Sequence, residues 1–134
     1  SPAWSIPSQN FMQRTFLKTK LHRATITSAD LDYEGSISLG RDLCQAAGLL
    51  EFEEVDIYDV TNGARFTTYV IYGELGQVQV NGAAARLVQP GDRIIVAGYV
   101  QLDASEIANH SARVVLLGDK NAIHSVENKC INQP

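Results

Sequence analysis

Apolar and polar residues alternate over short stretches of this chain, and turn-forming residues separate one stretch from the next. The clearest case is Val55 to Val60, followed by the turn Thr61 to Ala64 and by Arg65 to Tyr72, which is rich in β-branched and aromatic residues. This order predicts a β-hairpin. Further strands are predicted at 15–27 (a strand pair or one bent strand), 36–39, 77–80, 93–102, 113–117 and 121–126.

Few stretches have the composition of a helix. Arg41 to Ala47 does, and Gly48 directly after it suits the left-handed end of a helix. Ser105 to Asn109 suits a single helical turn. Many short strands and little helix favour a mainly β fold, and a compact barrel is favoured over a sandwich because closing the sheet removes its exposed edges.

The length and composition predict one domain. A chain of 134 residues with 45% hydrophobic content builds one well-buried core, which we assign to residues 12–126. Residues 1–11 are Ser/Pro-rich without periodicity, and we interpret them as a tag remnant or a disordered extension. Residues 127–134 are polar and predict a loose C-terminal tail.

Composition also narrows the partners. Fifteen acidic and eleven basic residues give a formal charge of -4 without a basic block, so nucleic acid is not an expected partner. No apolar run approaches the roughly 20 residues that cross a bilayer, and no export signal is seen, which predicts a cytoplasmic protein without membrane contact. Two cysteines without a CxxC motif and three histidines without ligand spacing predict neither a disulfide framework nor a metal site.

One short stretch suggests unusual chemistry, although the chain has no GxSxG, P-loop, GxGxxG or HExxH motif. Within Asp32 to Ser36 (DYEGS), Gly35 tolerates strained backbone and Ser36 places a hydroxyl beside the Gly35 carbonyl. Attack of this hydroxyl on the carbonyl gives an ester, and elimination with hydrolysis then releases a chain that begins with a ketone. Taken alone, a Gly-Ser pair is typical of a polar turn.

Four ordered blocks around this pair resemble the pyruvoyl-dependent aspartate 1-decarboxylase family over nearly all of residues 12–126. The matching blocks are Arg14-Thr15 with Lys20-Leu21-His22-Arg23; Ala29-Asp30-Leu31 with Tyr33-Glu34-Gly35-Ser36; Val60-Thr61-Asn62-Gly63 with Arg65-Phe66 and Thr68-Tyr69; and Val80-Asn81-Gly82-Ala83-Ala84-Ala85. Their order and spacing are far more specific than any single motif.

The resemblance implies a zymogen that cleaves itself between Gly35 and Ser36. The β chain would then end at Gly35, and the α chain would begin with a covalent pyruvoyl group formed from Ser36, which binds the substrate amine as a Schiff base. The implied reaction converts L-aspartate to β-alanine and CO2 for pantothenate (coenzyme A) biosynthesis, without a metal or pyridoxal phosphate. The implied fold is a small double-psi β-barrel with short helices, assembled as a homotetramer; the need for a maturation factor stays open.

The resemblance also assigns roles to individual residues. Lys20 and Arg65 match cationic positions that would pair with the two substrate carboxylates, Arg65 through a bidentate fork and Lys20 as a point charge. Tyr69 matches the proton donor, a role that suits a phenol because it is neutral at pH 7 yet can give up a proton. Thr68 matches a residue that hydrogen-bonds near the scissile peptide and assists processing.

A loop and two supporting residues complete the implied site. Asn81, Gly82, Ala83 and Ala84 match the substrate-binding loop, where small side chains let backbone amides approach an anion. Supporting roles in positioning or processing fall to His22 and Tyr33.

The chain departs from the family pattern at Tyr58, where relatives carry tryptophan, at Arg86, where others carry histidine, and in a shorter turn before Val78. Two alternatives remain at this point. One is a non-catalytic β-barrel binding module, and the other is a pyruvoyl decarboxylase of another acidic amino acid.

Overall fold

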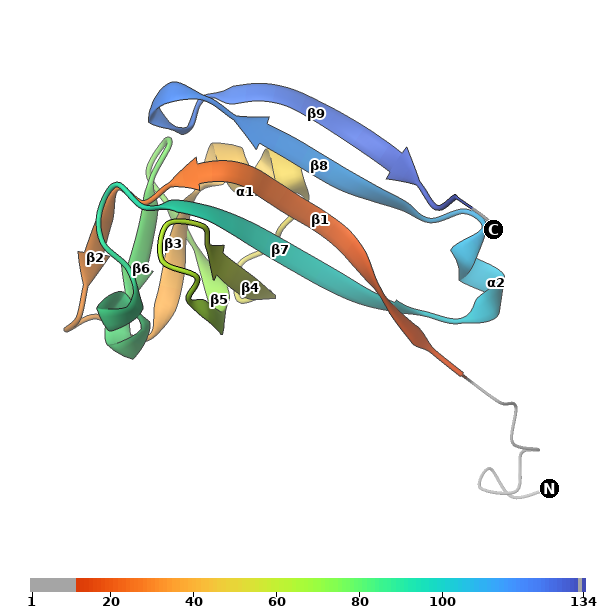
Figure 1. Cartoon of the computed structure of the whole chain (residues 1–134), viewed down its shortest axis with the longest axis horizontal. Coiled ribbons are helices and arrows are strands. Elements are labelled where there is room, and N and C mark those ends of the chain that lie inside the picture. The colour runs from red at the N-terminus through yellow and green to blue at the C-terminus, as the bar shows by residue number, and fades with distance from the viewer. Residues whose placement is uncertain (1–11, 133) are drawn as a thin grey trace, which may run out of the picture.

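The fold is built almost entirely from strands, as the alternating pattern predicts. The computed structural model describes residues 12–132 and 134 (Figure 1). Its strands are β1 (Arg14–Thr25), β2 (Ser28–Asp30), β3 (Ser36–Gly40), β4 (Glu54–Asp59), β5 (Arg65–Gly73), β6 (Val78–Asn81), β7 (Arg93–Leu102), β8 (Ser111–Leu117) and β9 (Ile123–Cys130). The helical elements are α1 (Arg41–Ala47), α2 (Ala104–Ile107) and the 3-10 helices η2 (Gly82–Leu87) and η3 (Asp119–Asn121).

The strands form one sheet that curls back on itself. Its order is β2-β6-β3-β5-β4-β7-β1-β8-β9, and β1 is joined to β2 by Ile26 and Thr27 alone. The Ile26 amide donates to the carbonyl of Asp92 (2.9 Å), and the Thr27 amide donates to that of Val78 (2.8 Å), so this joint is bonded to two other parts of the sheet. The mainly β class is confirmed, and the curled sheet is consistent with a small barrel. The double-psi topology stays a prediction.

The predicted hairpin and the predicted first helix are both confirmed. β4 and β5 pair antiparallel, with Asp56 opposite Thr67 and Tyr58 opposite Arg65. α1 ends at Gly48, whose φ of 72° is the left-handed conformation that glycine adopts without a steric cost.

The core includes a row of inward side chains that crosses the central strands. Leu21 lies opposite Val96, and Val96 and Phe66 both lie opposite Ile57. Leu21, Ile57 and Val96 are fully buried, and Phe66 packs against them from the edge of the cluster. Residues paired across neighbouring strands share one face of a sheet, so this row also fixes which residues of β4 and β5 face outward.

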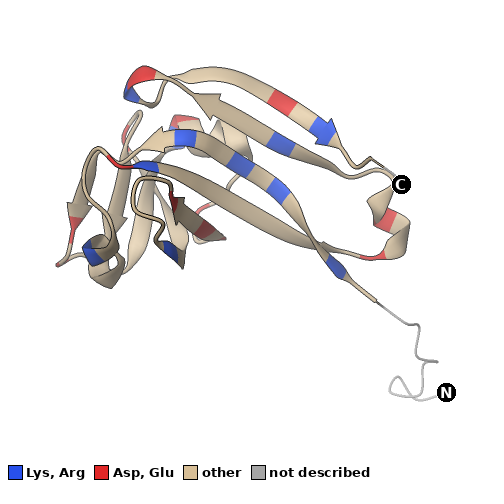
Figure 2. Cartoon of the chain, viewed as in Figure 1, with Lys and Arg blue, Asp and Glu red and all other residues tan. Residues whose placement is uncertain are grey.

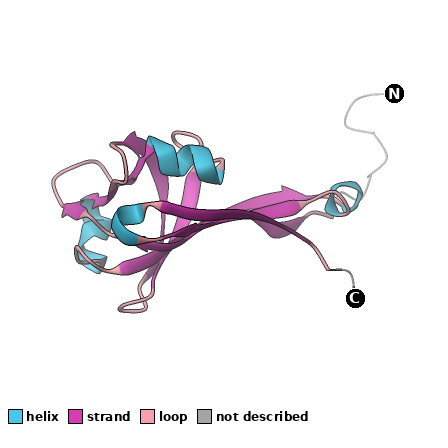
Figure 3. Ribbon diagram, turned by 90° about the horizontal axis from the view of Figure 1, so that it is seen from above, coloured by secondary structure: helices cyan, strands magenta, loops and turns pink. Residues whose placement is uncertain are grey.

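A long arm extends from this body (Figure 3). It contains the outer parts of β1 and β7, the β8–β9 hairpin and α2 (Figure 1). The prediction of a loose tail from Glu127 is wrong for 127–130, because β9 continues to Cys130, which pairs with Ser111. Most side chains of β9 are exposed, so a fully paired strand carries the polar composition of a tail. The interpretation of residues 1–11 lies outside the described residues.

Charged residues are spread over the surface. The four basic residues of β1 are spaced along that strand, and acidic residues lie on other strands and turns (Figure 2). No helix in the described part of the chain is both long and apolar enough to span a membrane.

Asn121 joins three parts of the fold. Its side chain is 1% exposed, and its Nδ2 donates to the carbonyls of Thr25 and Gly76, both at 2.9 Å. Its Oδ1 accepts from the Thr25 amide at 2.8 Å. Its φ of 58° is left-handed, a conformation that asparagine tolerates better than most residues. The end of β1 and the turn before β6 are therefore bonded to η3 through one side chain.

We expect Asn121→Ala to lower the free energy of unfolding by about 2–4 kcal/mol, because the amide of Thr25 and the carbonyls of Thr25 and Gly76 lose a buried partner. Chemical denaturation measures the change. Asn128→Ala is the control, because Asn128 is exposed on β9 and its loss should change the stability by less than about 0.5 kcal/mol. Equal effects of the two substitutions would contradict the joining role of Asn121.

Candidate active site

Ser36 is the first residue of β3 and is almost completely buried, at 1% exposure. Its Oγ donates to the carbonyl of Glu34 (2.9 Å) and accepts from Nδ2 of Asn81 (3.1 Å), which lies opposite it on β6. A serine hydroxyl has one proton and two lone pairs, so these two bonds fix its orientation. The hydroxyl is thus held in one orientation beside the Gly35–Ser36 peptide.

Asn81 is itself held by a polar relay along the outer face of β6. It is 0% exposed, its Nδ2 also donates to Ser38 Oγ (3.0 Å), and its Oδ1 accepts from Nε2 of Gln79 (2.7 Å). Oε1 of Gln79 in turn accepts from the hydroxyl of Ser28 (2.6 Å). These bonds determine which end of the Asn81 amide faces Ser36. Sequence reasoning missed Gln79, although its position two residues before Asn81 places both side chains on one face of the strand.

The loop that follows Asn81 lies directly against the predicted cleavage point. Gly82 has a φ of 74°, and a Cβ there would lie 2.6 Å from Cα of Gly35 and 2.8 Å from its amide nitrogen. Only a glycine allows this close approach of two backbones. Ala83 is exposed and Ala84 half-buried in the first turn of η2, so small residues continue along the loop.

Tyr69 comes next to Ser36 from the other side of β3. β3 and β5 run parallel with Ile37 opposite Val70, so one residue earlier Ser36 lies beside Tyr69, which Thr68 directly precedes on β5. Paired positions face the same side, which places Tyr69, Ser36 and Asn81 in one row across three strands.

Next to this row is a cavity of about 510 Å³. Its lining residues are Phe52, Glu54, Thr67, Thr68 and Tyr69. The ring of Phe52 packs against that of Tyr69, with 6.2 Å between centroids, so the phenol is held at the wall of the cavity.

The two predicted cations lie farther away. Lys20 is on β1, and β5, β4 and β7 separate that strand from β3. Arg65 lies on β5 but is exposed, and its guanidinium stacks over the ring of Tyr58 at 4.1 Å from the centroid. One chain therefore brings Tyr69, Asn81 and Gly82 to the Gly35–Ser36 peptide, with Thr68 next to Tyr69, but it does not bring Lys20 or Arg65 there.

Comparisons with known proteins match the sequence of this chain to one family. The family profile described as "Aspartate decarboxylase" matches residues 12–124. The chain is 48% identical to the aspartate 1-decarboxylase of Ralstonia nicotianae over 87% of this chain and 98% of that protein. It is 57% identical to that of Phenylobacterium zucineum (81% and 94%) and 56% identical to that of Caulobacter vibrioides (84% and 97%).

The chain belongs to the aspartate decarboxylase family. The family predicted from the sequence is confirmed, and with it the prediction that the chain is an enzyme.

Tyr58, a departure noted in the sequence, has a clear structural role in this member of the aspartate decarboxylase family. Its hydroxyl bonds to that of Tyr99 (2.8 Å), and burial together with this bond raises the pKa of Tyr58 to about 12. The phenol therefore stays neutral at physiological pH, and its ring provides a fixed platform for Arg65.

The two supporting residues are separated in the structure. His22 is half-buried on β1, where burial and the nearby charges of Lys20 and Arg23 lower its pKa, so it is neutral at pH 7. Tyr33 is 51% exposed, and its carbonyl lies close to Gly82. The sequence prediction that neither transfers a proton directly remains untested.

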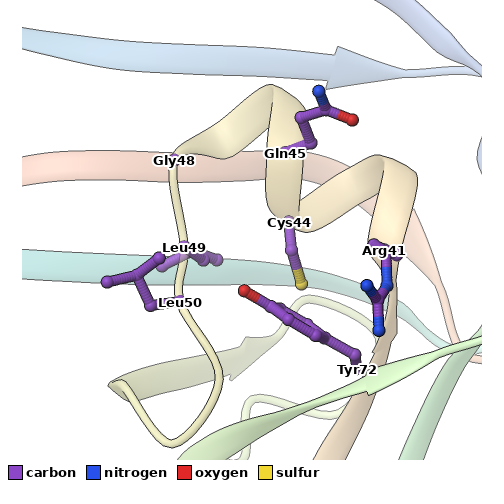
Figure 4. Close-up of a pocket in the computed structure, with 7 residues that line it drawn as sticks. All are labelled: Arg41, Cys44, Gln45, Gly48, Leu49, Leu50 and Tyr72. Atoms are coloured by element: carbon purple, nitrogen blue, oxygen red, sulfur yellow. The ribbon is translucent and has the colours of Figure 1, made fainter.

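A second cavity, of about 380 Å³, lies beside α1 (Figure 4). α1 follows the end of β3, so this cavity is at the opposite end of that strand from Ser36. Arg41 and Cys44 of α1 stand over the ring of Tyr72, with the guanidinium 4.8 Å from its centroid. Burial raises the pKa of the Cys44 thiol to about 11, so it is protonated and unreactive at neutral pH. Neither Cys44 nor Cys130 forms a disulfide. The described residues contain no group of three or more metal-ligating side chains.

The contact between Gly82 and Gly35 can be tested by adding one methyl group. Gly82→Ala should destabilise the protein more than Gly63→Ala, because both glycines have left-handed φ (74° and 80°) but only Gly82 has backbone within 4 Å of the added Cβ. Backbone strain of about 1–2 kcal/mol is common to both substitutions. The excess loss for Gly82, measured by thermal and chemical denaturation, reports the contact. Equal losses would mean that the loop moves away from Gly35 without a cost.

Proposed function

We propose that this chain is an aspartate 1-decarboxylase that is made as a zymogen, cleaves itself between Gly35 and Ser36, and then converts L-aspartate to β-alanine and CO2. The observation that carries the proposal is the buried hydroxyl of Ser36, fixed by Asn81 and Glu34 directly after a glycine. The relatives named aspartate 1-decarboxylase support the substrate.

The position of this hydroxyl supports self-cleavage by the following steps. Oγ of Ser36 attacks the carbonyl carbon of Gly35, the peptide C–N bond breaks, and an ester with a free Ser36 amine results. Loss of the Cα proton of Ser36 then expels the Gly35 carboxylate, and addition of water with release of ammonia leaves a ketone at the new N-terminus. Thr68, directly before Tyr69 on β5, is proposed to donate to the oxyanion of the first step.

The surroundings of Ser36 fit a small, neutral ketone. Burial excludes bulk water, and Nδ2 of Asn81 is a donor already aimed at the Ser36 oxygen. A pyruvoyl group supplies the electron sink that loss of CO2 from an amino acid needs and that ordinary side chains lack. Tyr69, beside Ser36 in the register, is proposed to return a proton to the α carbon of the substrate.

Recognition of aspartate requires partners for two carboxylates. Arg65, presented on the ring of Tyr58, is proposed to hold one of them in a bidentate fork, and Lys20 to attract the other. Backbone amides from Gly82 to Ala84 are proposed as further donors. Because one chain keeps Lys20 three strands from Ser36, assembly as a homotetramer, which the family resemblance implies, offers a way to bring the cations to the site.

The wider context belongs to the same proposal. The double-psi β-barrel, the cytoplasmic location and the supply of β-alanine for pantothenate biosynthesis follow from the family resemblance. The need for a separate maturation factor is settled by whether the purified chain cleaves alone.

Replacing Ser36 by Ala should abolish both cleavage and decarboxylation, because no hydroxyl remains to attack Gly35. Denaturing gels and mass spectrometry of the fragments report cleavage, and CO2 release from aspartate without added pyridoxal phosphate reports turnover. Ser38→Ala is the matched control, since Ser38 shares the Asn81 donor but is not next to Gly35, and it should still cleave. An uncleaved protein that decarboxylates aspartate would refute the mechanism. Release of CO2 from glutamate but not from aspartate would refute aspartate as the substrate.

Tyr69→Phe should lower turnover by about 100-fold or more while sparing cleavage, because a phenyl ring keeps the packing on Phe52 but has no proton to give. Tyr72→Phe, on the same strand but in the cavity beside α1, should leave turnover near the wild-type rate. Single-turnover rates and fragment ratios are measured on the same preparations. Loss of cleavage with normal turnover of the cleaved fraction would refute the role of Tyr69.

A further inference from the structure

Two buried carboxyl groups lie behind the turn that leads to Arg65. Asp59 ends β4 and is 2% exposed, and Asp92 precedes β7 and is 7% exposed. Asp59 lies opposite Ile94 of β7, two residues from Asp92, so the two side chains are diagonal neighbours on one face of the sheet. Two buried acidic residues that are diagonal neighbours need an explanation, because burial disfavours their charged forms.

The hydrogen bonds of the pair leave one oxygen unused. Oδ1 of Asp59 accepts from the amides of Thr61 (2.8 Å) and Asn62 (3.2 Å), whereas its Oδ2 is buried without a donor. Oδ2 of Asp92 accepts from the Gln89 amide (3.0 Å). A proton on Oδ2 of Asp59 turns that unused acceptor into a donor, and the neighbouring acceptor is the carboxylate of Asp92.

The charges around the pair favour one proton over none. Burial, followed by the side chain of Asp92, raises the pKa of Asp59, and the two turn amides only partly oppose this. None of the largest contributions to this raised pKa comes from a basic side chain. Arg65 is stacked on Tyr58, and Arg93 and Arg23, from β7 and β1, line a different cavity together with Lys120.

We propose that Asp59 and Asp92 share one proton under mildly acidic conditions, and that this carboxyl clasp positions Arg65 relative to the Asn81–Ala84 loop. Without the proton, two negative charges repel one another in a buried site and weaken the interaction between Asp59 and Asp92. Asp59 and Asp92 are positioning residues in this scheme, because neither touches the substrate.

The turn that follows Asp59 connects the clasp to Arg65 and to the Asn81–Ala84 loop. The Asp59 amide donates to the carbonyl of Ala64 (2.8 Å), directly before Arg65. Nδ2 of Asn62 donates to the carbonyl of Leu87 (2.8 Å), the last residue of the 3-10 helix that begins at Gly82. A change at Asp59 is thereby passed to Arg65 and to the loop. This positioning role rests on the proposed function; the shared proton does not.

The test of the shared proton is Asp59→Asn, because an asparagine amide can donate to Asp92 at every pH. A carboxyl whose pKa is raised on folding stabilises the protein fully below its ordinary pKa, and this contribution is lost as the pH rises through the raised value. The wild type therefore loses stability with rising pH, and the variant does not. We expect the Tm of Asp59→Asn to exceed that of the wild type by about 4 °C near neutral pH, and the difference to shrink in acid.

Two further variants keep the stability test decisive. Asp92→Asn can also bond to its partner at every pH and should reproduce the effect, whereas Asp59→Ala cannot and should lower the Tm at all pH values. Asp119→Asn, an exposed carboxyl in η3, is the control and should follow the wild type. Asparagine variants that are less stable than the wild type near neutral pH would overturn the shared proton.

Steady-state kinetics on fully cleaved enzyme test the positioning role. The KM for aspartate should rise with pH in the wild type relative to Asp59→Asn, while the kcat ratio and the extent of cleavage stay constant. An unchanged KM ratio across the pH range would refute the positioning role. A protein that shows the stability effect but decarboxylates no amino acid would instead refute the proposed function and leave the clasp intact.

Discussion

The hydrogen bond from the Asn81 amide to the Ser36 hydroxyl is the interaction around which the candidate site is arranged. It exists because β3 and β6 pair with Ser36 opposite Asn81, and because Gln79 fixes the orientation of the amide. A buried donor and a buried hydroxyl satisfy one another here at a position where either alone would destabilise the fold. The same pairing brings Gly82 against Gly35 and leaves β5 to supply Tyr69 on the other side.

The packing of the core also determines which side chains face the candidate site. The row of core residues through Leu21, Ile57 and Val96 sets which face of each strand is outward, and the outward face carries Tyr69, Ser36 and Asn81. The proposed carboxyl clasp of Asp59 and Asp92 is bonded to the turn that precedes Arg65. It shares no hydrogen-bond partner with Ser36, so the candidate cleavage point and the proposed clasp belong to different hydrogen-bond networks.

Much of this could be predicted from the sequence, for identifiable reasons. Local patterns determine the β4–β5 hairpin and α1, so alternation and a final glycine were sufficient to predict them. The predicted roles of Ser36 and Asn81 depended on the family resemblance. The bond of Gln79 to Ser28 and the proximity of Asp59 to Asp92 could not be predicted, because both depend on strand register between distant segments. β9 continues to Cys130, beyond the predicted end at residue 126, and the prediction ended early because a strand whose side chains are mostly exposed has no apolar periodicity to detect.

The place of β1 in the sheet has a consequence for how the molecule is assembled. β1 lies between β7 and β8, and every residue before the Gly35–Ser36 peptide, β1 and β2 included, belongs to the fragment that the proposed cleavage would separate. The fragments would remain interlocked through backbone hydrogen bonds on both edges of β1. Once unfolded, however, they would have to meet again in solution, so refolding would become a second-order process. Only the intact chain can fold in a first-order process, and cleavage removes that route.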